Sequence, residues 1–145
     1  MDEVPEIGEF NYYGVFQIYD YRHIEYLPEN IFNGLSIQKL SIADCYKLKE
    51  LPESIGNLIN LTELEIVGCI GDLIQFEKIP DSIGKLKGLK SLKIIGTAIE
   101  SLPDTIGNFE NLTYLEIHNN WNLHQLPNTI GNLKKLKTLH LEGGN

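Results

Sequence analysis

Residues 51–61 read Leu-Pro-Glu-Ser-Ile-Gly-Asn-Leu-Ile-Asn-Leu, and the same pattern returns three more times along the chain. Each copy continues into a run of the form Leu-x-x-Leu-x-Ile or Leu-x-x-Leu-x-Leu, and two degenerate runs, at Tyr13 and Ile37, come before the first complete copy. The first residues of the six runs are 24, 24, 28, 23 and 24 residues apart. Because a fixed period of this kind is typical of repeat architectures, the sequence predicts one structural unit stacked along an axis.

The residue types within each unit indicate its local structure. Apolar and polar residues alternate in each run, which predicts a short strand with one buried face. The proline that follows suits the first turn of a helical segment, whereas the glycine after each isoleucine disfavours a long helix, so we predict 3-10 or irregular arcs. One unit cannot bury its apolar edge alone. We therefore expect an α/β solenoid, a curved right-handed coil with about six short parallel strands on its concave face and the arcs on its convex face.

The repeats resemble the leucine-rich-repeat family over roughly residues 13–145, in the Leu-Pro-x-x-Ile-Gly-x-Leu type seen at 51–58. This type is similar to plant intracellular and resistance-protein repeat domains and to bacterial repeat proteins, and Gly-Thr-Ala-Ile-Glu-Ser-Leu-Pro at 96–103 strengthens the likeness. The resemblance implies a solenoid that binds a macromolecule, but the family binds proteins, peptides, lipids and sugars alike. Cys45 and Cys69 stand at the ninth position of adjacent repeats, where the family template implies a buried core residue.

The chain is interpreted as a single domain over residues 1–145. Residues 1–12 are acidic and include Pro5 and Gly8, and we expect them to cap the first coil, so that the repeats occupy 13–145. No return arc or polar cap follows the sixth run, although solenoids generally need capping repeats for solubility. Two explanations are expected for this bare end: the chain is a fragment of a longer protein, or the end packs on another copy in self-association.

Charge and composition exclude several classes of function. The formal net charge is −8, and the first 29 residues hold seven acids and one base. Such a field repels nucleic acid and anionic membrane surfaces, so we expect neither as a partner. No apolar run approaches the ~20 residues of a membrane helix. Met1-Asp2-Glu3 does not begin a signal peptide, and only two cysteines occur, which favours a cytoplasmic protein.

Side chains at positions three, five and seven of each run are expected to point out from the concave face, so the six strands can be compared in rows. Charges alternate between neighbouring strands in Lys39–Glu63 (row three) and in Glu65–Lys93–Glu116 (row five). Opposite charges on adjacent strands support a sheet by up to ~1 kcal/mol each. The same charges also suit a polar strip that selects a partner, and both interpretations stay open.

Row seven is apolar over three consecutive strands. It places Ala43, Val67 and Ile95 side by side, with Tyr19 next to them. An open sheet face has no structural need for apolar side chains, although scattered surface hydrophobic residues are common. We interpret this stretch as a partner contact, with Tyr114 as an anchor, because tyrosine is enriched at binding hot spots.

Two departures from the repeat template lie near the ends of the strands. Trp121 follows the turn residue Asn120, where it is interpreted either as a half-buried packing residue or as a contact at the rim of the binding face. One repeat has four extra residues, within 70–75, and carries the apolar residues Leu73 and Ile74. Because insertions in solenoids form loops on one face, we expect this loop to overhang the concave face and contribute to binding.

Histidines and carboxylates gather on the last two predicted strands. Glu116 is expected beside His140 in row five, and His118 beside Glu142 in row seven. Such a set can bind zinc, but a flat sheet face offers no dry pocket, so surface hydrogen bonding is the favoured interpretation. No nucleophile elbow, P-loop, zinc-protease or dinucleotide motif occurs, so we expect neither an enzyme nor a bound cofactor or metal.

The sequence thus predicts a noncatalytic protein-interaction module that binds another protein through the concave face and the loop at 70–75. Two alternatives remain: a ligand-sensing fragment of a larger immune-type receptor, and a carbohydrate- or metal-binding surface protein. The residues predicted to contact the partner are Tyr19, Lys39, Glu63, Glu65, Val67, Leu73, Ile74, Lys93, Ile95, Tyr114, Glu116, His118, Trp121 and His140.

Overall fold

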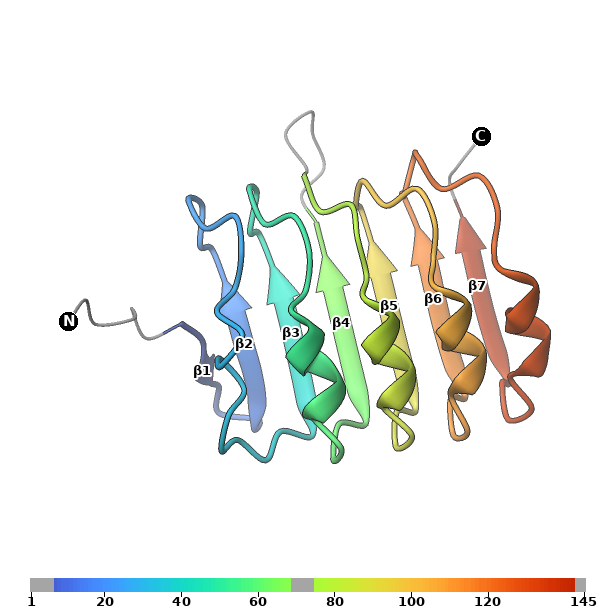
Figure 1. The fold of residues 1–145 in the computed structure, drawn as a ribbon, viewed down its shortest axis with the longest axis horizontal. Coiled ribbons are helices and arrows are strands. Elements are labelled where there is room, and N and C mark those ends of the chain that lie inside the picture. Colours follow the sequence, from blue (N-terminus) through green and yellow to red (C-terminus); the bar gives the residue numbers. More distant parts are fainter. Residues whose placement is uncertain (1–6, 69–74, 143–145) are drawn as a thin grey trace.

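The fold is a repeat solenoid built on one sheet. In the computed structural model, which describes residues 7–68 and 75–142, the described residues form a seven-stranded sheet whose strand order follows the sequence (Figure 1). The first strand, β1 (Glu9–Phe10), is antiparallel to its neighbour, and all later pairs are parallel. The parallel strands have five residues each: β2 (Val15–Tyr19), β3 (Lys39–Ala43), β4 (Glu63–Val67), β5 (Ser91–Ile95), β6 (Tyr114–His118) and β7 (Thr138–Glu142).

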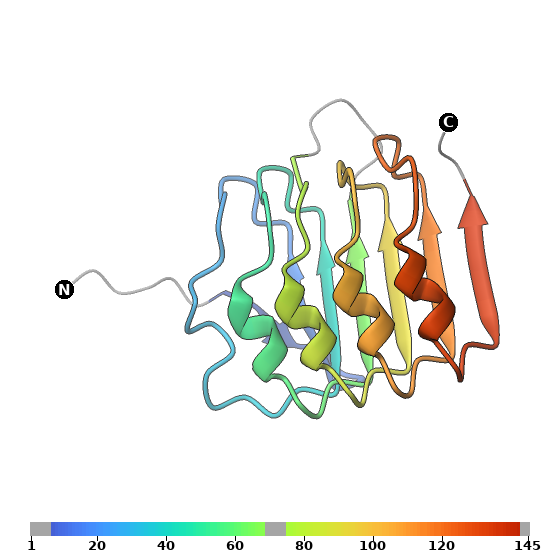
Figure 2. The same cartoon turned by 45° about the vertical axis from the view of Figure 1, so that its right-hand side comes forward.

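Short 3-10 helices form a second layer that covers one face of the sheet, as predicted (Figures 1 and 2). Each starts directly after a repeat proline, whose backbone is extended, with φ between −65° and −71°. The isoleucine of each motif donates its N–H to that proline's carbonyl, which closes the first turn. The four helices are η1 (Glu53–Asn57), η2 (Asp81–Lys85), η3 (Asp104–Asn108) and η4 (Asn128–Asn132).

The core lies between the sheet and the 3-10 layer. Along β5 the side chains alternate, so that Leu92 and Ile94 are 1% and 0% exposed while their neighbours are half-buried. From η2 the core receives Ile83, which is 0% exposed. Burying each of these side chains contributes about 1.5–3 kcal/mol, and only neighbouring coils supply the partners. The concave face is the other side of the same strands, and it carries the residues of positions three, five and seven.

Buried hydrogen bonds join neighbouring coils at the turn after each strand. Asn120, at the ninth position of its repeat, is 1% exposed and donates from Nδ2 to the Ile94 carbonyl at 2.9 Å. Its Oδ1 accepts from the N–H and the hydroxyl of Thr97, at 2.9 and 2.6 Å. Cys45, at the same position of an earlier repeat, donates more weakly to the Ala43 carbonyl at 3.4 Å and is half-buried. Cys69 lies outside the described residues.

The N-terminal edge contains a strand that the sequence did not predict. β1 lies within the predicted cap segment and pairs with the outer edge of β2, Phe10 opposite Phe16, with an edge-to-face ring contact at 5.1 Å. Gly8 precedes this strand with φ +87°, and a Cβ there would come within 2.5 Å of the Phe16 ring. Glycine is therefore required at position 8, both for the backbone conformation and for the close approach.

The C-terminal edge differs, because within the described part of the chain no strand lies beyond β7. Its inward-facing residues, Leu139 and Leu141, are 46% and 49% exposed, whereas the equivalent residues of β6, Leu115 and Ile117, are 1% and 4% exposed. The last coil therefore presents to solvent an apolar edge that every earlier coil buries against its neighbour.

Candidate binding surface on the concave face

The parallel register places the predicted rows side by side. Residues of equal position pair from β2 to β7, so row five runs through Gln17, Ser41, Glu65 and Lys93 and on to the last two strands. The side chains of these strands that face away from the core are half-buried or exposed. The concave face is thus a continuous surface to which every parallel strand contributes three side chains.

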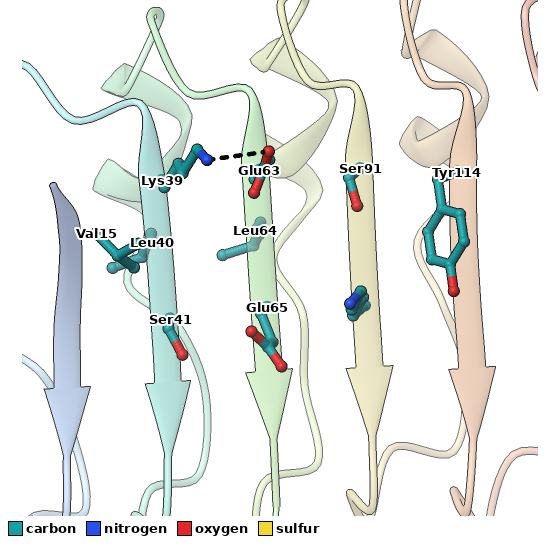
Figure 3. A pocket seen from close by; sticks show the side chains of 10 residues that line it. Val15, Lys39, Leu40, Ser41, Glu63, Leu64, Glu65, Ser91 and Tyr114 are labelled. Atoms are coloured by element: carbon teal, nitrogen blue, oxygen red, sulfur yellow. Dashed lines mark ion pairs between the residues drawn. The ribbon is translucent and has the colours of Figure 1, made fainter. Parts of the chain in front are cut away.

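A groove of about 430 Å³ crosses rows three and five from β2 to β6 (Figure 3). Its lining combines carboxylates, ammonium groups, serine hydroxyls and one phenol over buried leucines. The Lys39 Nζ atom lies 3.5 Å from Glu63 Oε1, which confirms the predicted cross-strand ion pair. Ser91 and Tyr114 continue row three on the next two strands, while Glu65 lies two residues further along β4, in row five (Figure 3).

The predicted charge ladder of row five does not form as ion pairs. Glu65, Lys93 and Glu116 are register neighbours, but within the described chain no carboxylate oxygen of either glutamate lies within 4.0 Å of the Lys93 Nζ atom. That ammonium group instead lies 5.7 Å from the centre of the Tyr114 ring. The prediction considered only backbone register, whereas the tyrosine ring offers the lysine a competing cation–π contact.

Glu116 is held by two neighbours on its own strand. The Tyr114 hydroxyl donates to Glu116 Oε2 at 2.7 Å, and His118 Nε2 lies 3.0 Å from Glu116 Oε1. The tyrosine hydrogen bond, helped by the charge of Lys93 and by His118, lowers the pKa of Glu116 against the opposing effect of desolvation. The same hydrogen bond raises the pKa of Tyr114. This hydrogen bond therefore orients the Tyr114 side chain, which lines the groove.

The histidines pair within strands rather than across them. The predicted lateral neighbours are in register, but His140 Nε2 lies 3.3 Å from Glu142 Oε2 on its own strand, as His118 does with Glu116. Residues two apart on a strand share a face, so this contact competes with the cross-strand one that we expected. The two imidazole rings lie 5.8 Å apart. In the described residues no three His, Cys, Asp or Glu side chains are placed to hold a metal ion.

Row seven forms an apolar strip beside this groove. Ala43, Val67 and Ile95 are register partners on three adjacent strands, and all three are half-buried. Tyr19 precedes them on β2 and is 59% exposed. Trp121 is 61% exposed, so it is not the half-buried packing residue that was one of its two interpretations. Leu73 and Ile74, in the loop at 70–75, lie outside the described residues.

Sequence reasoning missed a second pocket, at the N-terminal end of the concave face. It has a volume of about 330 Å³ and is lined by Gly8, Glu9, Gln17, Tyr19 and Tyr21. Its floor is fixed by a hydrogen bond from the Gly8 N–H to the Tyr21 hydroxyl at 3.0 Å. The pocket depends on β1, a strand of two residues that is too short to show an alternating pattern. The one feature of the sequence that could have indicated this pocket is the acidic segment that contains Glu9.

No helix in the described ranges 7–68 and 75–142 is long and apolar enough to cross a membrane. The stacked coils, the 3-10 layer and the open sheet face define a repeat solenoid with one exposed concave surface. A family model described as a leucine-rich repeat region matches residues 70–144, more than half of the chain, and the chain belongs to the leucine-rich-repeat family. Domains of this family are generally noncatalytic protein-interaction modules.

Solved structures with the same fold include the leucine-rich repeat domain of the type III effector XopL. It has a TM-score of 0.56 and 25% identity, over 88% of this chain and 51% of that one, so this chain spans about half of its length. The leucine-rich-repeat ectodomain of the plant membrane receptor kinase GASSHO1/SCHENGEN3 from Arabidopsis thaliana, in complex with CASPARIAN STRIP INTEGRITY FACTOR 2, has a TM-score of 0.40 and 19% identity, over 83% and 19%. The plant peptide hormone receptor RGFR1 in complex with RGF2 has a TM-score of 0.32 and 21% identity, over 95% and 37%. No curated protein sequence matches the chain.

Proposed function

We propose that this chain is a noncatalytic module that binds an extended segment of a partner protein across its concave face. The observation that carries the proposal is the continuity of two unlike strips on the same strands. The groove of rows three and five supplies charged and hydroxyl groups, and the strip of Ala43, Val67 and Ile95 supplies apolar contact next to it. An interface of this kind combines an apolar centre with a polar surround.

An open sheet face suits a polypeptide better than a small molecule. Its groove is open and spans five strands, whereas small-molecule sites are generally enclosed and mostly apolar. An extended segment lying across the strands contacts both strips at once, and the fixed Tyr114 ring gives it an anchor. Exposed Trp121 and the loop at 70–75, with Leu73 and Ile74, are proposed as further contacts at the rim.

The proposal is tested with a random peptide library of about 12 residues displayed on phage, selected against the whole chain. The double variant Val67→Thr/Ile95→Thr keeps β-branched side chains and adds no charge, but it replaces a methyl group of Val67 and the ethyl group of Ile95 with hydroxyls. We expect it to weaken the selected peptides about tenfold. Ile59→Thr is the matched control, because Ile59 is 72% exposed and follows η1, outside the strands of the concave face.

The two outcomes are distinct. If the double variant retains the wild-type circular dichroism spectrum and binds every selected peptide as tightly as the wild type does, the concave face is not the binding surface. Loss of affinity in the double variant, with Ile59→Thr unchanged, supports the proposal. Deleting four residues within 70–75 tests the loop in the same assay, and unchanged affinity would remove it from the interface.

A further inference from the structure

One carboxylate on the parallel strands has no partner among the described residues. Of the four glutamates on the concave side of these strands, Glu63 pairs with Lys39, Glu116 with Tyr114 and His118, and Glu142 with His140. The Glu65 carboxylate makes no hydrogen bond or ion pair with any described residue, although Glu65 lines the groove and is half-buried. A half-buried carboxylate without a partner in the chain can accept hydrogen bonds from a cationic group, and such charge-assisted hydrogen bonds are stronger than neutral ones.

A second carboxylate without a described partner lines the other pocket. The Glu9 carboxylate forms no ion pair or hydrogen bond within residues 7–68 and 75–142, and its pocket is also lined by the exposed Tyr19. A carboxylate beside an aromatic side chain is the combination that a guanidinium group prefers, because it can hydrogen-bond to the first and stack on the second. Both pockets therefore favour a basic side chain, and within them arginine over lysine.

The two carboxylates lie on one line across the sheet. Glu9 is the register partner of Gln17, which pairs with Ser41, which in turn pairs with Glu65. Row five therefore extends onto β1, with the two unpaired carboxylates three strands apart and only neutral residues between them. At ~4.8 Å per strand they are ~14 Å apart, which is close to the ~13 Å between residues i and i+4 of an extended chain at ~3.3 Å per residue.

We propose that the partner segment is basic and carries arginine, or less favourably lysine, at two positions four residues apart, one against Glu65 and the other against Glu9. This inference rests on the proposed function, because it names the chemistry of the segment that crosses the concave face. The net charge of −8 attracts such a segment over a longer range and accelerates its association. Lys93, on the strand after Glu65, sets the limit of the basic part, since its ammonium group repels a third cation there.

The peptides from the same library provide the test. We expect them to be enriched in pairs of basic residues separated by three others. Glu65→Gln should weaken such peptides about five- to tenfold and Glu9→Gln about threefold, because Glu9 is the more exposed of the two. Glu53→Gln is the matched control, since it makes the same charge change on η1, in the layer opposite the concave face. Moving one arginine of a selected peptide by a single position should weaken it by a similar factor.

Failure of this inference differs from failure of the proposed function. Two results would overturn the basic-segment proposal: selected peptides that lack basic pairs, or selected peptides whose affinity does not change with Glu65→Gln. The concave face would still be supported if Val67→Thr/Ile95→Thr weakened the binding of those peptides. If neither the charge variants nor the apolar double variant changes the affinity, or if no peptide is selected at all, both proposals are wrong.

Discussion

Gly107 and Gly131 occupy the same position in η3 and η4, but a methyl group added at each would meet different surroundings. At Gly107 it would lie 2.6 Å from the Cβ atom of Thr129 and 2.7 Å from its carbonyl oxygen, whereas at Gly131 nothing described lies within 4 Å. Neither glycine has a positive φ, so the backbone accepts alanine at both positions. We predict that Gly107→Ala destabilises the chain and that Gly131→Ala does not.

The magnitude follows from two opposing effects. The atoms that the new methyl meets at Gly107 include backbone, which cannot rotate away, so the coil that contains Thr129 must move, and overpacking of this kind costs about 1–3 kcal/mol. Replacing glycine with alanine also restricts the unfolded chain and stabilises the fold by about 0.4–1 kcal/mol. The free energy of unfolding should therefore fall by up to about 2.6 kcal/mol for Gly107→Ala and rise by up to about 1 kcal/mol for Gly131→Ala.

Thermal unfolding followed by circular dichroism measures both variants under the same conditions. For a domain of this size 1 kcal/mol shifts the Tm by about 2–4 °C, so the two Tm values should lie on opposite sides of the wild-type value. Gly84→Ala should lower the Tm as Gly107→Ala does, because its added methyl would lie 2.7 Å from the Thr105 carbonyl oxygen. Equal Tm shifts for Gly107→Ala and Gly131→Ala would refute the reasoning, since they would show that contact between coils does not restrict this position.

Two other perturbations test the hydrogen bonds described above. Asn120→Ala leaves the buried Thr97 without its hydrogen-bond acceptor, and we expect the free energy of unfolding, measured by urea titration, to fall by about 2–4 kcal/mol. Asn122→Ala is the control, because Asn122 is exposed, and it should change that free energy by less than about 0.5 kcal/mol. Similar losses at both positions would contradict the role of Asn120. Because the pKa of Glu116 is lowered in the folded chain, its carboxylate contributes stability that is present above the ordinary value of 4.5 and is lost as the pH falls through the lowered pKa. Tyr114→Phe should raise that pKa in an NMR titration, and an unchanged value would show that the hydroxyl does not hold the carboxylate in solution.

The repeat period predicted the backbone well. Once each run was identified as a strand of known length, the register of Lys39 with Glu63 and of Val67 with Ile95 followed, because a one-residue slip would move every buried side chain to the other face. The proline at the start of each motif located each 3-10 helix, because the strands on either side leave a fixed length of chain for the helical layer.

Side-chain pairing was less predictable. Lys93 has a tyrosine ring and two carboxylates within reach, and the choice among them depends on rotamers that backbone register does not determine. Glu9 could not be placed at all from the sequence, because β1 is held by the contact of Phe10 with Phe16 and by the conformation of Gly8 rather than by a pattern of its own. The carboxylate of Glu65 was placed correctly, but its lack of a partner is visible only in the structure.

The exposed edge at β7 gives the molecule a direction of unfolding. Each coil of a repeat protein is stabilised mainly by its two neighbours, and among the described coils the last has a neighbour on one side only, whereas the first is closed by β1. In the 145-residue chain, we therefore expect local opening to begin at Leu139 and Leu141 and to proceed coil by coil toward the N-terminus. Backbone amides should exchange with solvent fastest in β7 and more slowly in β6 and β5. Glu65 and the groove around it then lie in the well-protected part of this chain, and the groove stays ordered while β7 opens.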